Sequence, residues 1–164
     1  GISADSDIVI DDLVVHSFNV SHDAAQPLGF TVSCGEHKVG IATDLGVYDD
    51  YIIENLQGLD AMLIEANHDV NLLQVGSYPY YLKQRILGKK GHLSNEMSGR
   101  LIDTILNDNV KGILLGHLSK ENNYDKLAFE TVKSEIDMSA GRYMAKDFNI
   151  EVACREEPSR IITI

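Results

Sequence analysis

The spacing of short apolar runs is the feature that most constrains the fold. Runs rich in β-branched and apolar residues crowd the first third of the chain, and afterwards they alternate with segments of helical periodicity. Strands are predicted at 7–10, 13–20, 29–34, 38–43, 60–65, 112–115, 149–153 and 160–164. Helices are predicted at 51–56, 79–87 and 124–136, and after Ser94, which is a good N-cap residue. This order favours helices that cover a mixed or antiparallel sheet over a classical parallel order, so the predicted class is α/β or α+β in layers.

Length and composition limit the chain to one globular domain. Its 164 residues include 14 Lys and Arg against 25 Asp and Glu, a formal charge of −11, which argues against non-specific binding of a polyanion. Every apolar run is far shorter than the roughly 20 residues that cross a bilayer, so we expect no membrane partner and a cytoplasmic location. The two cysteines, Cys34 and Cys154, form no C-x-x-C pair, and neither common glycine-rich nucleotide motif is present.

Three side chains that commonly bind metals follow predicted strands. His22, Asp44 and His117 each come just beyond the C-terminal end of a strand. Loops at one edge of a sheet can assemble a hydrolase metal site, because the strands fix the direction of each ligand while a coordination position stays open for water. The imidazole and carboxylate ligands suit zinc or manganese. The alternative for each residue taken alone is a cap or a solvated side chain.

Five stretches of the chain together resemble a known family. They are VSHDA at 20–24, ATDLG at 42–46, LIEANHD at 63–69, GHLSN at 91–95 and LGHLSKENN at 115–123. Their order and spacing resemble the metallo-β-lactamase fold superfamily, and within it the YycJ/WalJ-type hydrolases, across nearly the whole chain.

The resemblance implies a four-layer αββα sandwich with two divalent metal ions, zinc or manganese, at one edge. His22 then resembles a metal ligand, Asp44 the carboxylate that bridges both ions, and His117 the last histidine ligand. Two such ions would activate a water molecule for attack on phosphorus. They would also stabilise the attacking oxygen and the leaving oxygen of an in-line phosphoryl displacement.

Glu65 and His92 are further catalytic candidates. Related tRNA 3′-processing enzymes of this fold have a similar glutamate and a similar histidine, which act together in protonating the leaving group. By that resemblance His92 would donate the proton and Glu65 would orient it. The alternative is that Glu65 caps the end of a strand and His92 merely precedes a helix.

The family's His-x-His-x-Asp-His motif is absent, and no two of the six histidines are separated by one residue. In the family this motif precedes the segment that matches His22. The resemblance therefore implies that residues 1–164 are the C-terminal half of one metallo-β-lactamase-like domain, inactive alone. The expected partners are a nucleic-acid substrate, with DNA preferred, and the N-terminal half of the same domain, with a homo-oligomer as an alternative.

A basic stretch surrounds His92, and the resemblance to nucleases of this family implies that it faces a phosphodiester substrate. The candidate substrate-binding residues are Lys83, Arg85, Lys89, Lys90 and Asn122. Nearby Tyr78, Tyr80 and Tyr81 are candidates for stacking on a base. The alternatives are a solvated helix face for the basic residues and core packing for the tyrosines.

Three functions remain open from sequence. The leading one is a metal-dependent phosphodiesterase, most concretely an exonuclease on DNA. The second is a hydrolase of the same fold that cleaves another ester, a thioester or a lactam. The third is a catalytically incomplete fragment that binds a partner through an exposed sheet face.

Overall fold

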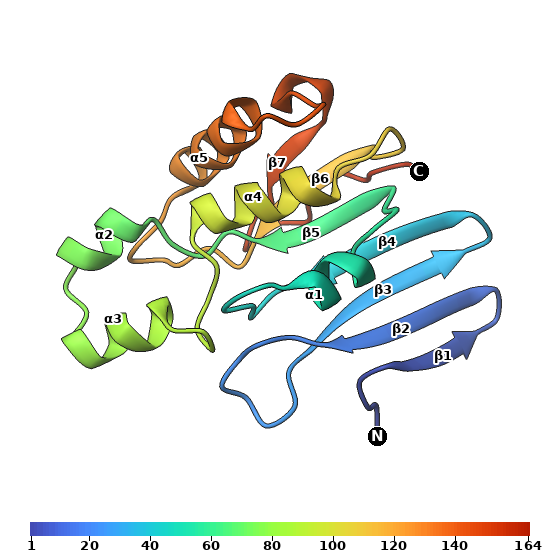
Figure 1. Ribbon diagram of the computed structural model, residues 1–164, viewed down its shortest axis with the longest axis horizontal. Coiled ribbons are helices and arrows are strands. Elements are labelled where there is room, and N and C mark those ends of the chain that lie inside the picture. The colour runs from blue at the N-terminus through green and yellow to red at the C-terminus, as the bar shows by residue number, and fades with distance from the viewer.

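The computed structural model describes residues 1–164 and contains one seven-stranded sheet with helices packed on one face (Figure 1). The strands are β1 (Ser6–Ile10), β2 (Leu13–Asn19), β3 (Leu28–Cys34), β4 (His37–Ala42), β5 (Ala61–Glu65), β6 (Gly112–Gly116) and β7 (Ile150–Val152). The helices are α1 (Asp50–Asn55), α2 (Val70–Val75), α3 (Tyr80–Leu87), α4 (Asn95–Ile105) and α5 (Asp125–Met138), with a 3₁₀ turn at Ala145–Asp147. The predicted α/β class is confirmed.

The sheet is mixed, and its strands lie side by side in chain order. Strands β1 to β4 pair antiparallel, whereas β4 to β7 pair parallel. The change agrees with the connections, since antiparallel neighbours can be joined by short loops whereas parallel neighbours need longer crossovers. Gly35 turns the β3–β4 hairpin with φ of +58°, a conformation that glycine adopts without steric cost. Strands β2, β4, β5 and β6 consequently point the same way, and their C-terminal ends share one edge.

The hydrophobic core lies between the sheet and helices α1, α4 and α5 (Figure 1). Alternate residues of β5 and β6 face these helices, and those of α4 repeat at helical spacing. The fully buried side chains at this interface include Met62, Ile64, Leu101, Ile102, Ile105, Ile113 and Leu115. Ser94 caps α4 by accepting a hydrogen bond from the Met97 N–H, as the sequence predicts.

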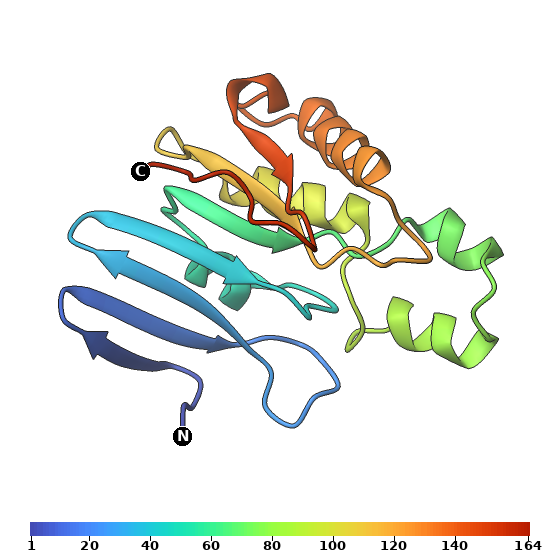
Figure 2. The ribbon, with the colours of Figure 1, turned by 180° about the vertical axis from the view of Figure 1, so that it is seen from behind.

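The opposite face of the sheet carries no helix (Figure 2). The strand register places Val15, Val32 and Val39 in one row on this face and Ile41 and Leu63 in the next. Ile41 remains 40% exposed. Much of this face is thus an apolar surface without a covering layer.

The C-terminal segment differs from its prediction. The expected strand at 160–164 is wrong, because these residues pair with no strand. The segment instead crosses the open face, where Ile162 packs against Gly112 (Figure 2). A β-branched run can therefore be used for packing on a sheet rather than for extending it.

Helices α2 and α3 lie away from the sheet, next to the edge where the strands end (Figure 1). The sequence does not predict α2, whose six residues are too short for a clear helical period. Its N-cap, Asp69, accepts a hydrogen bond from the Leu72 N–H at 2.8 Å. None of the helices combines the length and the apolar character that a bilayer crossing requires.

Candidate functional site

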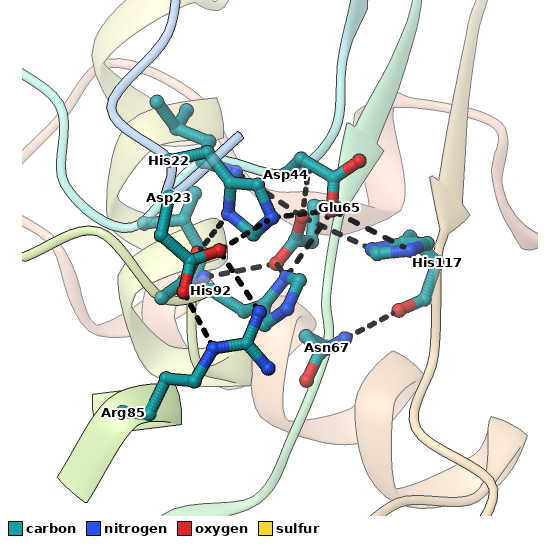
Figure 3. A network of polar contacts seen from close by, with 11 residues as sticks. His22, Asp23, Asp44, Glu65, Asn67, Arg85, His92 and His117 are labelled. Carbon is teal, nitrogen blue, oxygen red and sulfur yellow. Dashed lines mark hydrogen bonds and ion pairs between the residues drawn. The ribbon is translucent and has the colours of Figure 1, made fainter. Parts of the chain in front are cut away.

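The common edge of β2, β4, β5 and β6 brings five titratable side chains together (Figure 3). His22 lies beyond β2, Asp44 beyond β4 and His117 beyond β6, while Glu65 ends β5. His92 joins them from the segment that leads into α4. The ligand-type atoms of Asp44, Glu65, His92 and His117 lie within 4.8 Å of one another. The sheet edge therefore gathers every catalytic and metal-binding candidate that the sequence indicated.

Two of these residues hold a costly backbone conformation. Asp44 and His117 both have φ of +56°, in the left-handed region that side chains with a Cβ rarely adopt. Each such residue costs on the order of 1 kcal/mol, and such residues cluster at functional sites. At each residue the left-handed conformation turns the chain just after a strand, β4 before Asp44 and β6 before His117. Both side chains thereby lie at the same edge of the sheet.

Glu65 is the buried centre of the cluster. Its side chain is fully inaccessible and accepts hydrogen bonds from five donors. They are the N–H groups of Asp44, Leu45 and Leu93 and the Nδ1 atoms of His92 and His117. Burial alone would raise the pKa of Glu65, but the hydrogen bonds from His117 and His92 outweigh it and lower the pKa below its ordinary value. Glu65 is ionised, with its oxygens already engaged by the protein.

Hydrogen bonds hold the Nδ1 atoms of His22, His92 and His117, so the Nε2 atom of each ring is available to bind a metal ion or to transfer a proton. His22 Nδ1 lies 2.9 Å from the Gly91 carbonyl oxygen, and the Nδ1 atoms of His92 and His117 lie 3.0 and 3.2 Å from the Glu65 carboxylate. These oxygens only accept, so each Nδ1 carries a proton. The neutral ring then presents a lone pair at Nε2, the usual arrangement of a metal-ligating histidine.

The donor set fits a divalent metal ion. Asp44 Oδ1 lies 3.5 Å from His22 Nε2 and 3.8 Å from His117 Nε2, so one oxygen and two nitrogens converge. Imidazole and carboxylate ligands suit zinc and manganese alike. Two histidines and one carboxylate also leave coordination positions open.

His92 sits between the two other imidazoles. Its ring centroid lies 4.9 Å from that of His22 and 5.2 Å from that of His117. Its Nδ1 is held by Glu65, so Nε2 is the atom free to exchange a proton with a bound substrate.

Close contact between loop backbones positions His22 and His92. A Cβ on Gly46 would lie 2.3 Å from the Lys89 carbonyl oxygen, and one on Gly91 would lie 2.0 Å from the Ile86 carbonyl oxygen. Both distances are shorter than any allowed contact, so only glycine permits this approach. It lets the Gly91 carbonyl reach His22.

A cleft of about 1210 Å³ opens in front of the site. Its lining residues include His22, Asp44, His92, His117, Arg85, Asn67, Tyr78, Ser119, Lys120, Asn123, Tyr124 and Arg155. Among the sequence candidates for substrate binding, Arg85 and Tyr78 line this cleft.

The other basic candidates lie outside the cleft lining. Lys83 donates from Nζ to the carbonyl oxygens of Gln74 and Gly76, while Lys89 and Lys90 are exposed. Asn122 is buried and does not line the cleft, and Ser119 Oγ accepts a hydrogen bond from its backbone N–H at 3.2 Å. Tyr80 and Tyr81 are about three-quarters exposed on α3.

Sequence reasoning missed two residues near His117. Asn67 Nδ2 donates to the His117 carbonyl oxygen at 2.8 Å, and the Asn67 carbonyl oxygen accepts from the Ser119 N–H at 2.8 Å. Arg155, from the segment after β7, lines the cleft. Asn67 lies in one of the five matched stretches, so its position there was the available signal.

Relatives with assigned names match most of the chain. Exodeoxyribonuclease YycJ from Bacillus anthracis is 35% identical over 150 residues, which are 92% of this chain and 56% of the relative. Exodeoxyribonuclease WalJ from Streptococcus pneumoniae serotype 2 is 42% identical over 125 residues, 76% of this chain and 46% of the relative. The chain thus spans about half the length of the curated relatives it matches, and no family model matches it.

A solved structure has the same fold at low sequence identity. The metallo-β-lactamase fold protein YhfI from Bacillus subtilis superposes with a TM-score of 0.63 at 14% identity, over 93% of this chain and 50% of that protein. Fold and sequence agree with the resemblance carried by the five stretches. The chain belongs to the metallo-β-lactamase fold superfamily, in the branch of the YycJ and WalJ proteins.

Proposed function

We propose that this chain carries part of the active site of a metal-dependent phosphodiesterase, most concretely an exonuclease that acts on DNA. One observation carries the proposal: Asp44 Oδ1 and the Nε2 atoms of His22 and His117 converge, with the Nδ1 atoms of both rings held by acceptors. The relatives named exodeoxyribonuclease support the choice of DNA.

His22, Asp44 and His117 are the residues that would hold two divalent metal ions, zinc or manganese. Such ions, when bound, supply Lewis acidity that activates water and polarises a phosphodiester. Glu65 supports them without binding metal, because it orients His117 and shapes the turn at Asp44.

His92 would protonate the leaving oxygen. Glu65 holds Nδ1 of this ring, so the imidazolium carries its other proton on Nε2, where it can be transferred. The neutral ring left after transfer keeps its bond to Glu65 and its position between His22 and His117. Glu65 and His92 therefore act as one pair.

The open sheet face supports a proposal about domain organisation. An apolar face with residues such as Val32, Val39 and Ile41 at or near the surface needs a covering layer. We propose that residues 1–164 form one half of a four-layer domain whose other sheet packs here. On this proposal the chain alone has little or no activity.

Metal binding by the chain itself tests the ligand assignment. We expect zinc to bind the wild-type chain in equilibrium dialysis, and Asp44→Asn to weaken binding at least roughly 10-fold. Asp125→Asn is the matched control, because Asp125 also lines the cleft but lies outside the ligand cluster. Equal zinc affinity in the wild type and in Asp44→Asn would exclude Asp44 as a ligand.

Hydrolysis is tested by complementation. The chain is mixed with the part of the Bacillus anthracis relative that does not align with it, and nucleotide release is followed from DNA labelled at one end. We expect release that requires metal, is lost in Asp44→Asn and persists in Asp125→Asn. A zinc-loaded mixture that hydrolyses a thioester or lactam but no phosphodiester would overturn the proposed reaction.

A further inference from the structure

The cleft contains three cationic side chains, and they differ in how they are held. Arg85 forms a two-point ion pair with Asp23, at 2.5 Å from Nε and 2.9 Å from Nη2. This pair lowers the pKa of Asp23 to about 2, so the carboxylate stays charged and offsets Arg85. Lys120 has no ion pair, and no hydrogen bond fixes its ammonium group.

Arg155 is held by a hydrogen bond and forms no ion pair. Its Nη2 donates to the carbonyl oxygen of Leu118, the residue after His117, and no carboxylate forms an ion pair with it. Its backbone is anchored two residues earlier, where the Ala153 N–H donates to the Leu115 carbonyl oxygen at 2.8 Å. Two bonds therefore tie Arg155 to β6 and to the loop that carries His117.

The position of Arg155 is close to the catalytic cluster. Arg155 donates to the carbonyl oxygen of the residue that follows His117, and both residues line the same cleft. A guanidinium held through one N–H by a carbonyl oxygen keeps further donors in a planar fork, which suits phosphate oxygens.

We propose that Arg155 binds a non-bridging phosphate oxygen of the nucleic-acid strand that lies in the cleft beside His117. The inference rests on the proposed function, since it names the residue that recognises the phosphodiester. It also bears on substrate binding by a chain of charge −11, because the Arg155 guanidinium, unlike that of Arg85, is not engaged in an ion pair, although Glu121, Asp125 and Glu156 also line the cleft. Arg85 serves mainly to brace the segment that contains His22.

Binding is measured with a fluorescein-labelled single-stranded oligonucleotide whose phosphorothioate linkages slow hydrolysis, in the presence of zinc. We expect Arg155→Gln to weaken binding roughly 10-fold or more, as for the loss of one charge-assisted contact. It should also lower the slope of log affinity against log salt by about 0.7. Arg155→Lys should keep the salt slope but weaken binding, because it retains charge without the fork.

Arg160→Gln is the matched control. Arg160 lies on the same segment and pairs with Glu151, and it does not line the cleft. Zinc affinity is measured in each variant, and an unchanged value in Arg155→Gln shows that the loop around His117 is intact.

The outcomes separate this inference from the proposed function. If the wild type binds and Arg155→Gln binds as well as Arg160→Gln, the assignment of Arg155 is overturned while the nuclease proposal stands. Weaker binding in Arg155→Gln together with weaker zinc affinity also overturns it, since Arg155 then acts on the metal site. If the zinc-loaded wild type binds no oligonucleotide, the nucleic-acid substrate fails together with the inference.

Discussion

Replacing Glu65 with glutamine should destabilise the metal-free chain far more than its small change in shape suggests. Glu65 is fully buried, and its two oxygens accept from three backbone N–H groups and two imidazoles. Glutamine keeps one oxygen but replaces the other with an NH₂ group. An NH₂ group donates and cannot accept, so the N–H donors that faced the lost oxygen have no acceptor.

The magnitude depends on which oxygen is replaced. If the NH₂ group takes the place of Oε1, the N–H of Leu93 loses its acceptor, and His92 must change its tautomer to accept a hydrogen bond. If it takes the place of Oε2, the N–H groups of Asp44 and Leu45 are left unpaired. A buried unpaired donor costs about 1 to 3 kcal/mol, so Glu65→Gln should lower the free energy of unfolding by roughly 2 to 4 kcal/mol.

Urea unfolding in the presence of a chelator measures this loss without a contribution from metal binding. Glu130→Gln is the matched control, because Glu130 is exposed on α5, and it should change the free energy by less than about 0.5 kcal/mol. Glu65→Leu should be worse than Glu65→Gln, since it removes both acceptors. A Glu65→Gln chain as stable as Glu130→Gln would refute the role of Glu65 as the shared acceptor of these donors.

Three further changes test the surroundings of the site. Asn67→Ala should weaken zinc binding about 10-fold in dialysis while the chain stays folded by circular dichroism, because the His117 carbonyl loses its donor; unchanged affinity would remove Asn67 from the support of His117. Gly91→Ala should lower both stability and zinc affinity, since its Cβ would meet the Ile86 carbonyl oxygen at 2.0 Å; wild-type values of both would disprove this packing. Burial lowers the pKa of His68 from 6.5 to about 4, so the unfolded chain gains a proton before the folded one as pH falls. Stability should drop by about 3 kcal/mol between pH 6.5 and 4, and urea titrations of His68→Leu should show a smaller drop; an equal drop would exclude His68 as its source.

The elements of the fold were largely predictable because their causes are local. Alternating apolar residues, the Gly35 turn and the Ser94 cap act within a few residues, and such local signals predict all seven strands and every α-helix except α2. The segment 160–164 has the composition of a strand, but packing on the open sheet face decided its conformation. Composition cannot distinguish these two uses of β-branched residues.

The catalytic candidates were predictable for a similar reason, whereas the substrate-binding residues were not. Strand direction brings His22, Asp44 and His117 to one edge whatever the loops do. The basic residues depend on partners distant in sequence: the carbonyl groups at the end of α2 hold Lys83, and Asp23 holds Arg85. Clustering of charge along the sequence therefore did not predict which cations line the cleft.

Glu65 also explains how the candidate site can be well ordered within this one sheet. Its carboxylate joins the turn after β4, the entry to α4 and the imidazole that follows β6. The left-handed residues Asp44 and His117 are thereby held by a buried ionic hydrogen-bond network within this one sheet. A second sheet on the open face would not be needed to fix Asp44 and His117, because Glu65 already holds both through hydrogen bonds. Its contribution to the site would be additional ligands and the far wall of the cleft, which predicts that zinc binding by this chain precedes and does not require assembly with a partner.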